Sequence, residues 1–430
     1  MERSSPVYQA YCRILRDELQ MATGCTEPIA LAFCAAKART VLGAVPDRVD
    51  IQVSGNIIKN VKSVVVPNTN GLKGIPAAAA AGIVAGDETA GLMVISHISP
   101  EQQRMIRAFL DTTPVSVSPM KECDILDIGV SVFSGEQEAY VRLNRTHTHL
   151  ALISRNGETL WSENPEPDKS GGQTDESLLS IKDIFDYADS LHTGDVKDVL
   201  DRQIRCNTAI AREGLGGRWG AGVGRILLET GGNGVRTRAR AMAAAGSDAR
   251  MSGCEMPVVI NSGSGNQGLT VSLPVLEYAK ELKAGEQDIY RALALANLCA
   301  VHLKSAIGKL SAYCGAITAG AAAAAGVAYL KTHDLETIAH TIVNAIAIDS
   351  GIVCDGAKPS CAAKISTAID CGLFGLEMYE NGSQFYGGDG ILSKGIENTI
   401  RNIGELGREG MRETDAKILE IMTRDNRSRP

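Results

Sequence analysis

The sequence predicts an α+β protein in which an N-terminal mixed α/β domain precedes a mostly helical, Ala/Gly-rich domain. Runs of alternating apolar residues, which are typical of strands, occur together with helical patterns before residue 165. After residue 178, segments with helical periodicity dominate, and they are rich in alanine and glycine. Residues 163–173 are polar and contain Pro and Gly, as linkers do. We therefore expect domains at residues 1–165 and 178–430.

Composition narrows the class of protein. The chain has 430 residues, enough for two or three packed units, and its 44% hydrophobic and 22% charged residues are normal for a globular protein. The net charge is −7 and the basic residues are dispersed, apart from the alternating Arg236, Arg238 and Arg240, so we expect no nucleic-acid partner. Eleven cysteines show no disulfide-scaffold spacing, and the N-terminus lacks the apolar segment of a signal peptide. These features predict a cytoplasmic location.

Two helices are expected at the start of the chain. Residues 7–19 carry one apolar stripe at helical spacing. Thr26 is predicted to be the N-cap of the next helix, because Glu27 and Pro28 suit its first turn and an apolar run follows. Cys25 then lies directly before a helix.

The rest of the first domain is expected to alternate between strands and helix. The predicted strands are residues 49–53, 61–66, 125–133, 138–144 and 149–153, with a buried helix at residues 77–84. Turn residues, among them those at 67–71, separate these segments.

The second domain is expected to be helical around one strand. The predicted helices are residues 181–191, 196–212, 276–284, 287–304, 312–331 and 335–348, with a strand at 257–261. Residues 311–330 are uncharged and reach the roughly 20 residues that span a bilayer. They consist mainly of Ala and Gly, whereas spanning helices depend on Leu, Ile, Phe and Val, so a buried helix and no membrane contact are expected.

A glycine-rich loop, residues 261–268, follows the predicted strand. Its spacing satisfies Gly-x-Gly-x-x-Gly, in which backbone N–H groups can approach an anion. A dinucleotide site also needs a second strand about 20 residues later, where residues 287–300 are predicted to be helical. The loop is also similar to that of fold-type-II pyridoxal-phosphate dehydratases, but no lysine for a Schiff base occurs between Lys197 and Lys280. Plain loop geometry and a small-anion cradle remain the alternatives.

Three cysteines in the last third of the chain, Cys314, Cys354 and Cys361, are the candidate metal ligands. Cys354 and Cys361 lie on a segment broken by glycine and proline, which can bring both sulfurs to one metal. Spacing alone leaves open whether they bind metal or are buried as small hydrophobic side chains. His147 and His149 alternate on a predicted strand, where solvated or capped histidines are favoured over metal ligands.

Four segments together resemble the iron–sulfur L-cysteine desulfidases, which are related to the α-subunit of bacterial iron–sulfur L-serine dehydratases. The segments are residues 24–32, 59–71, 261–268 and 354–361, and the similarity runs along nearly the whole chain. This resemblance implies a [4Fe–4S] cluster and a proton acceptor. The implied ligands of the cluster are Cys314, Cys354 and Cys361, and the implied proton acceptor is Cys25.

The resemblance implies β-elimination from L-cysteine, giving pyruvate, hydrogen sulfide and ammonia. Three protein thiolates, instead of the usual four, would leave one iron free for the leaving group. The start of a helix would favour a thiolate at Cys25. The predicted carboxylate ligands lie on two turns: Gly263, Gly265, Asn266 and Gln267, with Asn68 and Thr69 as second candidates.

Three other functions remain open from the sequence. L-serine or another β-substituted amino acid could be the substrate of the same cluster. A non-catalytic redox or metal-storage protein would keep the cluster without turnover, and a nucleotide-binding protein would use the glycine-rich loop without iron. The Ala/Gly-rich helices are compatible with a homo-oligomer.

Overall fold

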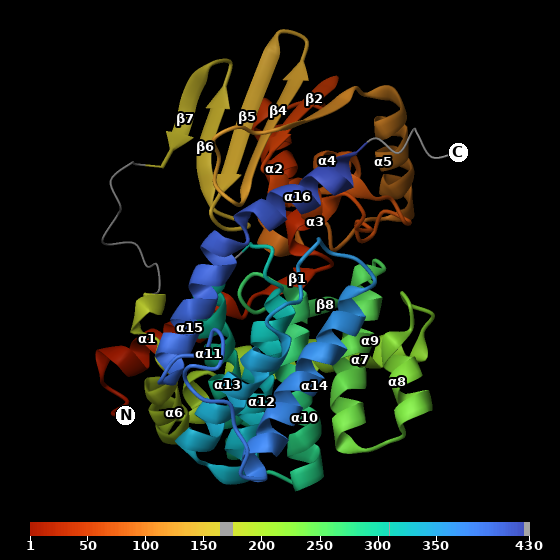
Figure 1. The fold of residues 1–430 in the computed structure, drawn as a ribbon. Coiled ribbons are helices and arrows are strands. Elements are labelled where there is room, and N and C mark those ends of the chain that lie inside the picture. Colours follow the sequence, from red (N-terminus) through yellow and green to blue (C-terminus); the bar gives the residue numbers. More distant parts are fainter. Residues whose placement is uncertain (164–174, 309, 425–430) are drawn as a thin grey trace.

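A sheet with its covering helices and a larger helical body make up the protein (Figure 1). The computed structural model describes residues 1–163, 175–308 and 310–424. Each part has its own buried core, and the α+β class expected from the sequence is confirmed.

The sheet part is antiparallel except at one edge. Within the described residues it has six strands in the order β3-β2-β4-β5-β6-β7, and only β2 and β3 pair in parallel. Its elements are β2 (Arg48–Val53), β3 (Val115–Pro119), β4 (Asp127–Ser134), β5 (Gln137–Asn144), β6 (Leu150–Arg155), β7 (Glu158–Ser162), α2 (Thr26–Leu42), α3 (Gly55–Val61), α4 (Gly74–Ala85) and α5 (Pro100–Thr112). Alternation in β2 buries Val49, Ile51 and Val53, which pack with the apolar α2 and α4.

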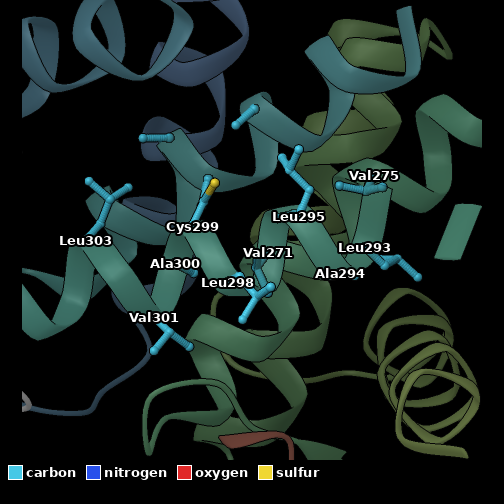
Figure 2. Close-up of a cluster of buried hydrophobic side chains, with 14 of the residues drawn as sticks. Val271, Val275, Leu293, Ala294, Leu295, Leu298, Cys299, Ala300, Val301 and Leu303 are labelled. Atoms are coloured by element: carbon cyan, nitrogen blue, oxygen red, sulfur yellow. The ribbon is translucent and has the colours of Figure 1, made fainter. Parts of the chain in front are cut away.

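The helical part is built around α12 (Gly315–Thr332). Residues 316–329 of this helix are buried, and α10, α11, α13 and α14 pack around it. The other elements of this part are α1 (Pro6–Glu18), β1 (Met21–Thr23), α6 (Ile181–Ser190), α7 (Lys197–Gly216), α8 (Val223–Gly231), α9 (Val235–Met251), β8 (Pro257–Val259), α10 (Gly265–Leu282), α11 (Glu286–Ile307), α13 (Leu335–Asp349), α14 (Cys361–Glu380) and α15 (Ile396–Glu405). Figure 2 shows a section of this core, with Val275 of α10 and Leu295 of α11 among its side chains.

The chain passes between the two parts more than once. The helix α1 packs in the helical core, where Tyr8 and Tyr11 contact Tyr187 of α6. The last helix, α16 (Arg412–Thr423), instead packs on α3 of the sheet part (Figure 1). The expected linker falls almost entirely on residues 164–174, outside the described residues, and the domain division at 165 and 178 stays a prediction.

Several expected elements differ from those observed. Residues 61–66 do not form a strand: Ser54 caps α3, which continues to Val61, and only Val65 makes an isolated bridge, with Lys73. The helix expected at 276–284 is α10, which starts at Gly265 because Ser264 caps it. Other helices and strands were not expected, because their sequence patterns are too weak to recognise. They are α5, α8, α9, α14, α15, α16, β3 and β7.

The uncharged segment at 311–330 forms the buried helix α12, as expected. Among the described residues, no helix combines the length and apolar character needed to cross a bilayer. Small side chains bring α12 and α14 very close. A Cβ atom added at Gly372 of α14 would lie 2.6 Å from the carbonyl oxygen of Gly320 in α12.

We expect Gly372→Ala to destabilise the protein. The added methyl group has no space, and overpacking a buried contact costs about 1–3 kcal/mol, more than the ~1 kcal/mol that alanine gains over glycine by helix propensity. Gly216→Ala, at the end of α7 with no atom within 4 Å of the added Cβ, is the matched control and should change stability by less than about 0.5 kcal/mol. Urea unfolding of both variants measures the difference, and equal midpoints would contradict the packing argument.

Candidate active site

A cavity of about 110 Å³ lies where the sheet part meets the helical part. From the sheet part, α2 and α3 contribute Glu27 and Lys59, and Cys25 precedes α2. The helical part contributes residues of α9, α10, α11, α12 and α14 and of the loop before α14. All four cysteines singled out from the sequence line this cavity: Cys25, Cys314, Cys354 and Cys361.

Short backbone pairings bring the three distant cysteines of the helical part together. Tyr313 and Val353 form an antiparallel bridge. The Cys354 N–H donates to the Ala312 carbonyl at 2.6 Å, and the Cys314 N–H donates to the Ile352 carbonyl at 3.2 Å. The two cysteine segments therefore lie side by side, although they are 40 residues apart in the sequence.

The loop from Cys354 to Cys361 is fixed against the sheet part by a glycine. Gly356 has φ +93°, and a Cβ atom there would lie 2.3 Å from the Lys59 carbonyl oxygen of α3. Beyond the loop, Cys361 is the first residue of α14 and packs beside the cluster that contains Cys25. The loop conformation therefore brings the third cysteine to the boundary between the two parts.

Four helices begin at this cavity. Cys25 is the N-cap of α2 and Cys314 is the N-cap of α12. Cys361 opens α14, and Asn266 and Gln267 lie in the first turn of α10. The N-terminus of a helix has unpaired N–H groups and a partial positive charge, which favour thiolates and other anions. The wall of this cavity therefore carries the positive ends of four helices.

Cys25 and Glu27 form a hydrogen-bonded pair in this wall. The Cys25 thiol donates to Glu27 Oε2 at 3.0 Å, and Asn60 Nδ2 donates to Glu27 Oε1 at 3.2 Å. Burial raises the pKa of the Cys25 thiol well above its usual value, the Glu27 carboxylate raises it as well, and Arg250 lowers it. Burial thus opposes the effect of the helix N-terminus that the sequence suggested. The N-cap is Cys25 itself rather than Thr26, whose hydroxyl instead donates to the Gly263 carbonyl at 2.8 Å.

The thiols of the three-cysteine set influence one another. Burial, followed by the neighbouring Cys354 and Cys361 thiols, raises the pKa of Cys314 to about 12. Burial also lowers the pKa of Lys304, which lines the cavity, to about 8, whereas Cys354 and Cys314 act in the opposite direction. Metal binding by these cysteines would therefore displace thiol protons, and the charge of Lys304 would offset the resulting negative charge.

The donor chemistry of this cavity suits an iron–sulfur cluster, which proteins hold through cysteine thiolates. Among the described residues, no group of three or more His, Cys, Asp or Glu is close enough to hold one metal ion. Two thiolates on one zinc ion lie within about 4.6 Å, twice the ~2.3 Å bond. In a four-iron cluster each cysteine binds a different iron, so the three sulfurs lie further apart around a shared space. In this chain three cysteines and the buried Lys304 line one cavity.

The structure places the other predicted site residues in different surroundings. Asn266 and Gln267 line the cavity, whereas Gly263 lines an adjoining cavity of about 720 Å³ that shares Glu27, Ser264 and Leu310 with the first. Gly265 begins α10 and packs against the side chain of Arg250.

Asn68 and Thr69 are not among the residues that line the cavity. The Asn68 side chain donates to the Ile95 carbonyl at 2.8 Å, and the Thr69 hydroxyl donates to the Val66 carbonyl at 2.7 Å. Their loop supports the Cys25 turn, since a Cβ atom at Gly24 would lie 2.2 Å from Pro67 Cγ. Their role as substrate ligands stays a prediction.

Of the two histidines considered as ligands, His149 bonds through Nδ1 to Asn144 Oδ1 at 2.9 Å. His147 lines the adjoining cavity. Among the described residues, no histidine lines the cysteine-lined cavity.

Sequence reasoning missed several cavity residues with charged side chains. Arg250 ends a helix that the sequence did not reveal, and Glu27 was assigned only to a first turn. Lys304 carried a usable signal, because it is the single lysine of the helix predicted at residues 287–304, whose other charged residues, Asp288 and Arg291, lie near its start. The other two charged cavity residues that sequence reasoning missed are Lys59, which pairs with Asp415, and Lys364, which pairs with Asp355.

Comparison with known proteins identifies the family. The profile described as serine dehydratase alpha chain matches residues 89–420, so the chain belongs to the serine dehydratase alpha-chain family. Relatives include a UPF0597 protein of Desulfitobacterium hafniense, 56% identical over 98% of both chains. A UPF0597 protein of Lachnoclostridium phytofermentans is 47% identical over 97% of this chain and 100% of its own. Another, of Finegoldia magna, is 46% identical over 96% of this chain and 99% of its own.

We expect Asp415→Asn to weaken the contact between α16 and the cavity wall. The Lys59 side chain is 2% exposed and pairs with Asp415, so the substitution leaves a buried ammonium without its counter-charge. The free energy of unfolding should fall by about 1–3 kcal/mol. Glu420→Gln, on the same helix but in exposed pairs with Lys417 and Arg424, is the control and should leave the unfolding midpoint unchanged. Denaturant unfolding distinguishes the two, and equal effects would contradict a buried pair.

Proposed function

We propose that this protein is an iron–sulfur-dependent lyase that removes the β-substituent of a small amino acid, with L-cysteine as the substrate. The observation that carries the proposal is the meeting of Cys25 with Cys314, Cys354 and Cys361 around one buried cavity. Membership of the serine dehydratase alpha-chain family supports the lyase class. The same family name makes L-serine the second candidate substrate.

The three cysteines of the helical part would hold the cluster. When bound, a [4Fe–4S] cluster with three protein ligands supplies an open iron that can act as a Lewis acid toward the leaving sulfur or oxygen. Lys304 beside Cys314 and Cys354 would offset the negative charge of the thiolates. Lys364, which pairs with Asp355, would hold the ligand loop by also donating to the Val353 carbonyl.

Cys25 would remove the α-proton of the substrate. Its thiol proton first passes to Glu27, whose Oε2 already accepts the hydrogen bond. The thiolate then takes the proton from Cα, and the electron pair of that C–H bond forms a Cα–Cβ double bond as the bond from Cβ to sulfur breaks. A buried thiolate with a raised pKa is a strong base, and the charge of Arg250 stabilises it.

The products follow without further catalysis. Loss of sulfide from L-cysteine gives an enamine, which tautomerises to an imine, and water hydrolyses the imine to pyruvate and ammonia. The protein therefore has to supply binding, one base and a stabilised leaving group.

Anaerobic purification followed by iron, acid-labile sulfide and absorbance measurements tests the cofactor. We expect a cluster in the wild type and its loss in Cys354→Ala, whereas Cys123→Ser, which changes a cysteine outside the cavity, should retain it. Pyruvate and sulfide should form in equal amounts from L-cysteine, with a higher kcat/KM than for pyruvate from L-serine. A higher kcat/KM for L-serine would make the protein a dehydratase, and a cluster without turnover would favour redox or storage.

We expect the proton-transfer pair to be separable from the cluster by mutation. Cys25→Ala and Glu27→Gln should each lower kcat by about 10²–10⁴-fold, because one removes the base and the other its proton acceptor, while iron content stays at the wild-type level. Glu136→Gln, in the exposed turn between β4 and β5, is the matched control. Stopped-flow or steady-state pyruvate assays measure the effect. Normal turnover in Cys25→Ala would remove the base assignment and leave the cluster assignment intact.

A further inference from the structure

Arg250 is a buried cation for which the described residues provide no carboxylate partner. It lies in the last turn of α9 and is 2% exposed. Its Nη1 donates to Asn266 Oδ1 at 3.2 Å, and its Nε has no hydrogen-bond partner. Lys59, which lines the cavity from the sheet part, pairs with Asp415. A buried charge without a counter-charge is costly, so a fold that retains one provides for an anion that binds later.

Two glycines make room for the polar groups around this arginine. A Cβ atom at Gly265 would lie 2.3 Å from Arg250 Nε and 2.8 Å from its Cζ. A Cβ atom at Gly315 would lie 2.8 Å from Gln267 Cδ. Gln267 is 5% exposed, and its Oε1 has no partner. The guanidinium group therefore lies directly against the first residue of α10.

The start of α10 adds a second source of positive potential at the same place. This helix has 18 residues, and Asn266 and Gln267 in its first turn line the cavity. The N-terminus of such a helix binds carboxylates through its free N–H groups. An arginine beside it can bind both oxygens of one carboxylate, which an ammonium group cannot do in the same way.

The other cations of the cavity already have counter-charges. Lys59 and Lys364 pair with carboxylates, and Lys304 lies beside the thiols of Cys314 and Cys354. Arg250 lies close enough to Cys25 for its charge to act on that thiol. An anion bound by Arg250 is therefore held next to the proposed base.

We propose that Arg250 and the N-terminus of α10 bind the α-carboxylate of the amino-acid substrate and present its Cα to Cys25. The choice of an amino acid rests on the proposed function. Carboxylate binding by Arg250 can be tested separately from the lyase reaction, because binding requires no leaving group on the ligand. Arg250 sets specificity for α-amino acids over amines or thiols of similar size.

L-alanine is the probe, because it has the ammonium and carboxylate groups of the substrate but no β-leaving group. Calorimetric titration of the anaerobically purified protein should detect binding in the wild type and weakening of about 100-fold or more in Arg250→Gln. Arg250→Lys should weaken it about tenfold, since the charge remains and the paired donors do not. Ethylamine, which lacks the carboxylate, should not bind. Arg225→Gln, which changes an exposed arginine of α8, should bind L-alanine as the wild type does.

The thermal stability of the ligand-free protein distinguishes a binding role of Arg250 from a purely structural one. Arg250→Gln removes a buried, uncompensated charge, so the Tm of the ligand-free protein should stay the same or rise. An L-alanine affinity within threefold of wild type in Arg250→Gln, or in Arg250→Lys should the first variant not fold, would overturn the proposal. Absence of L-alanine binding to the wild type, or equal binding of ethylamine, would overturn it as well.

The two proposals fail in different ways. A wild type that binds L-alanine through Arg250 but releases no pyruvate from L-cysteine or L-serine leaves the carboxylate site standing and removes the lyase. A wild type that turns over L-cysteine while Arg250→Gln keeps the same KM leaves the lyase standing and removes the site.

Discussion

The convergence of four helix N-termini on one buried cavity is the constraint on which the rest of the site depends. Each helix N-terminus carries N–H groups that need acceptors. Three of the four N-termini lie at Cys25, Cys314 and Cys361. The fourth opens α10 beside Arg250. Positive helix ends and buried cations that share one cavity are stable only with anions nearby. Thiolates and a substrate carboxylate are the anions that this chain and its proposed chemistry supply.

Backbone pairing helps to position three of these helix ends, those of α2, α10 and α12. The β1–β8 pair joins the segment just before Cys25 to the segment just before the glycine-rich loop. The bridge between Tyr313 and Val353 joins two cysteine segments in the same manner. Both pairings lie at the boundary between the sheet part and the helical part. The cavity therefore depends on the two parts being held together, to which α16 contributes through Lys59 and Asp415.

Small residues allow this arrangement to be dense. Glycines at 320 and 372 let α12 and α14 approach until backbone meets backbone, and alanines fill most of the remaining interface. Glycines also allow close packing in the cavity wall, where Gly265 leaves space for the Arg250 side chain and Gly315 for that of Gln267. A chain with few aromatic residues can thus bury polar and charged groups without leaving large voids.

The sequence by itself determined the fold class, the strands with clear alternation, the long apolar helices and the four cysteines, because local periodicity and residue chemistry carry that information. It did not reveal α9 or the true start of α10, and so it gave no reason to consider Arg250. It suggested a lowered pKa for Cys25 from its place before a helix, whereas burial and Glu27 raise it. Only the tertiary structure decided which polar groups share the cavity and which of them lack partners. The physical reason is that burial and counter-charges depend on contacts between segments far apart in the chain, as between Lys59 and Asp415, and no local pattern records those contacts.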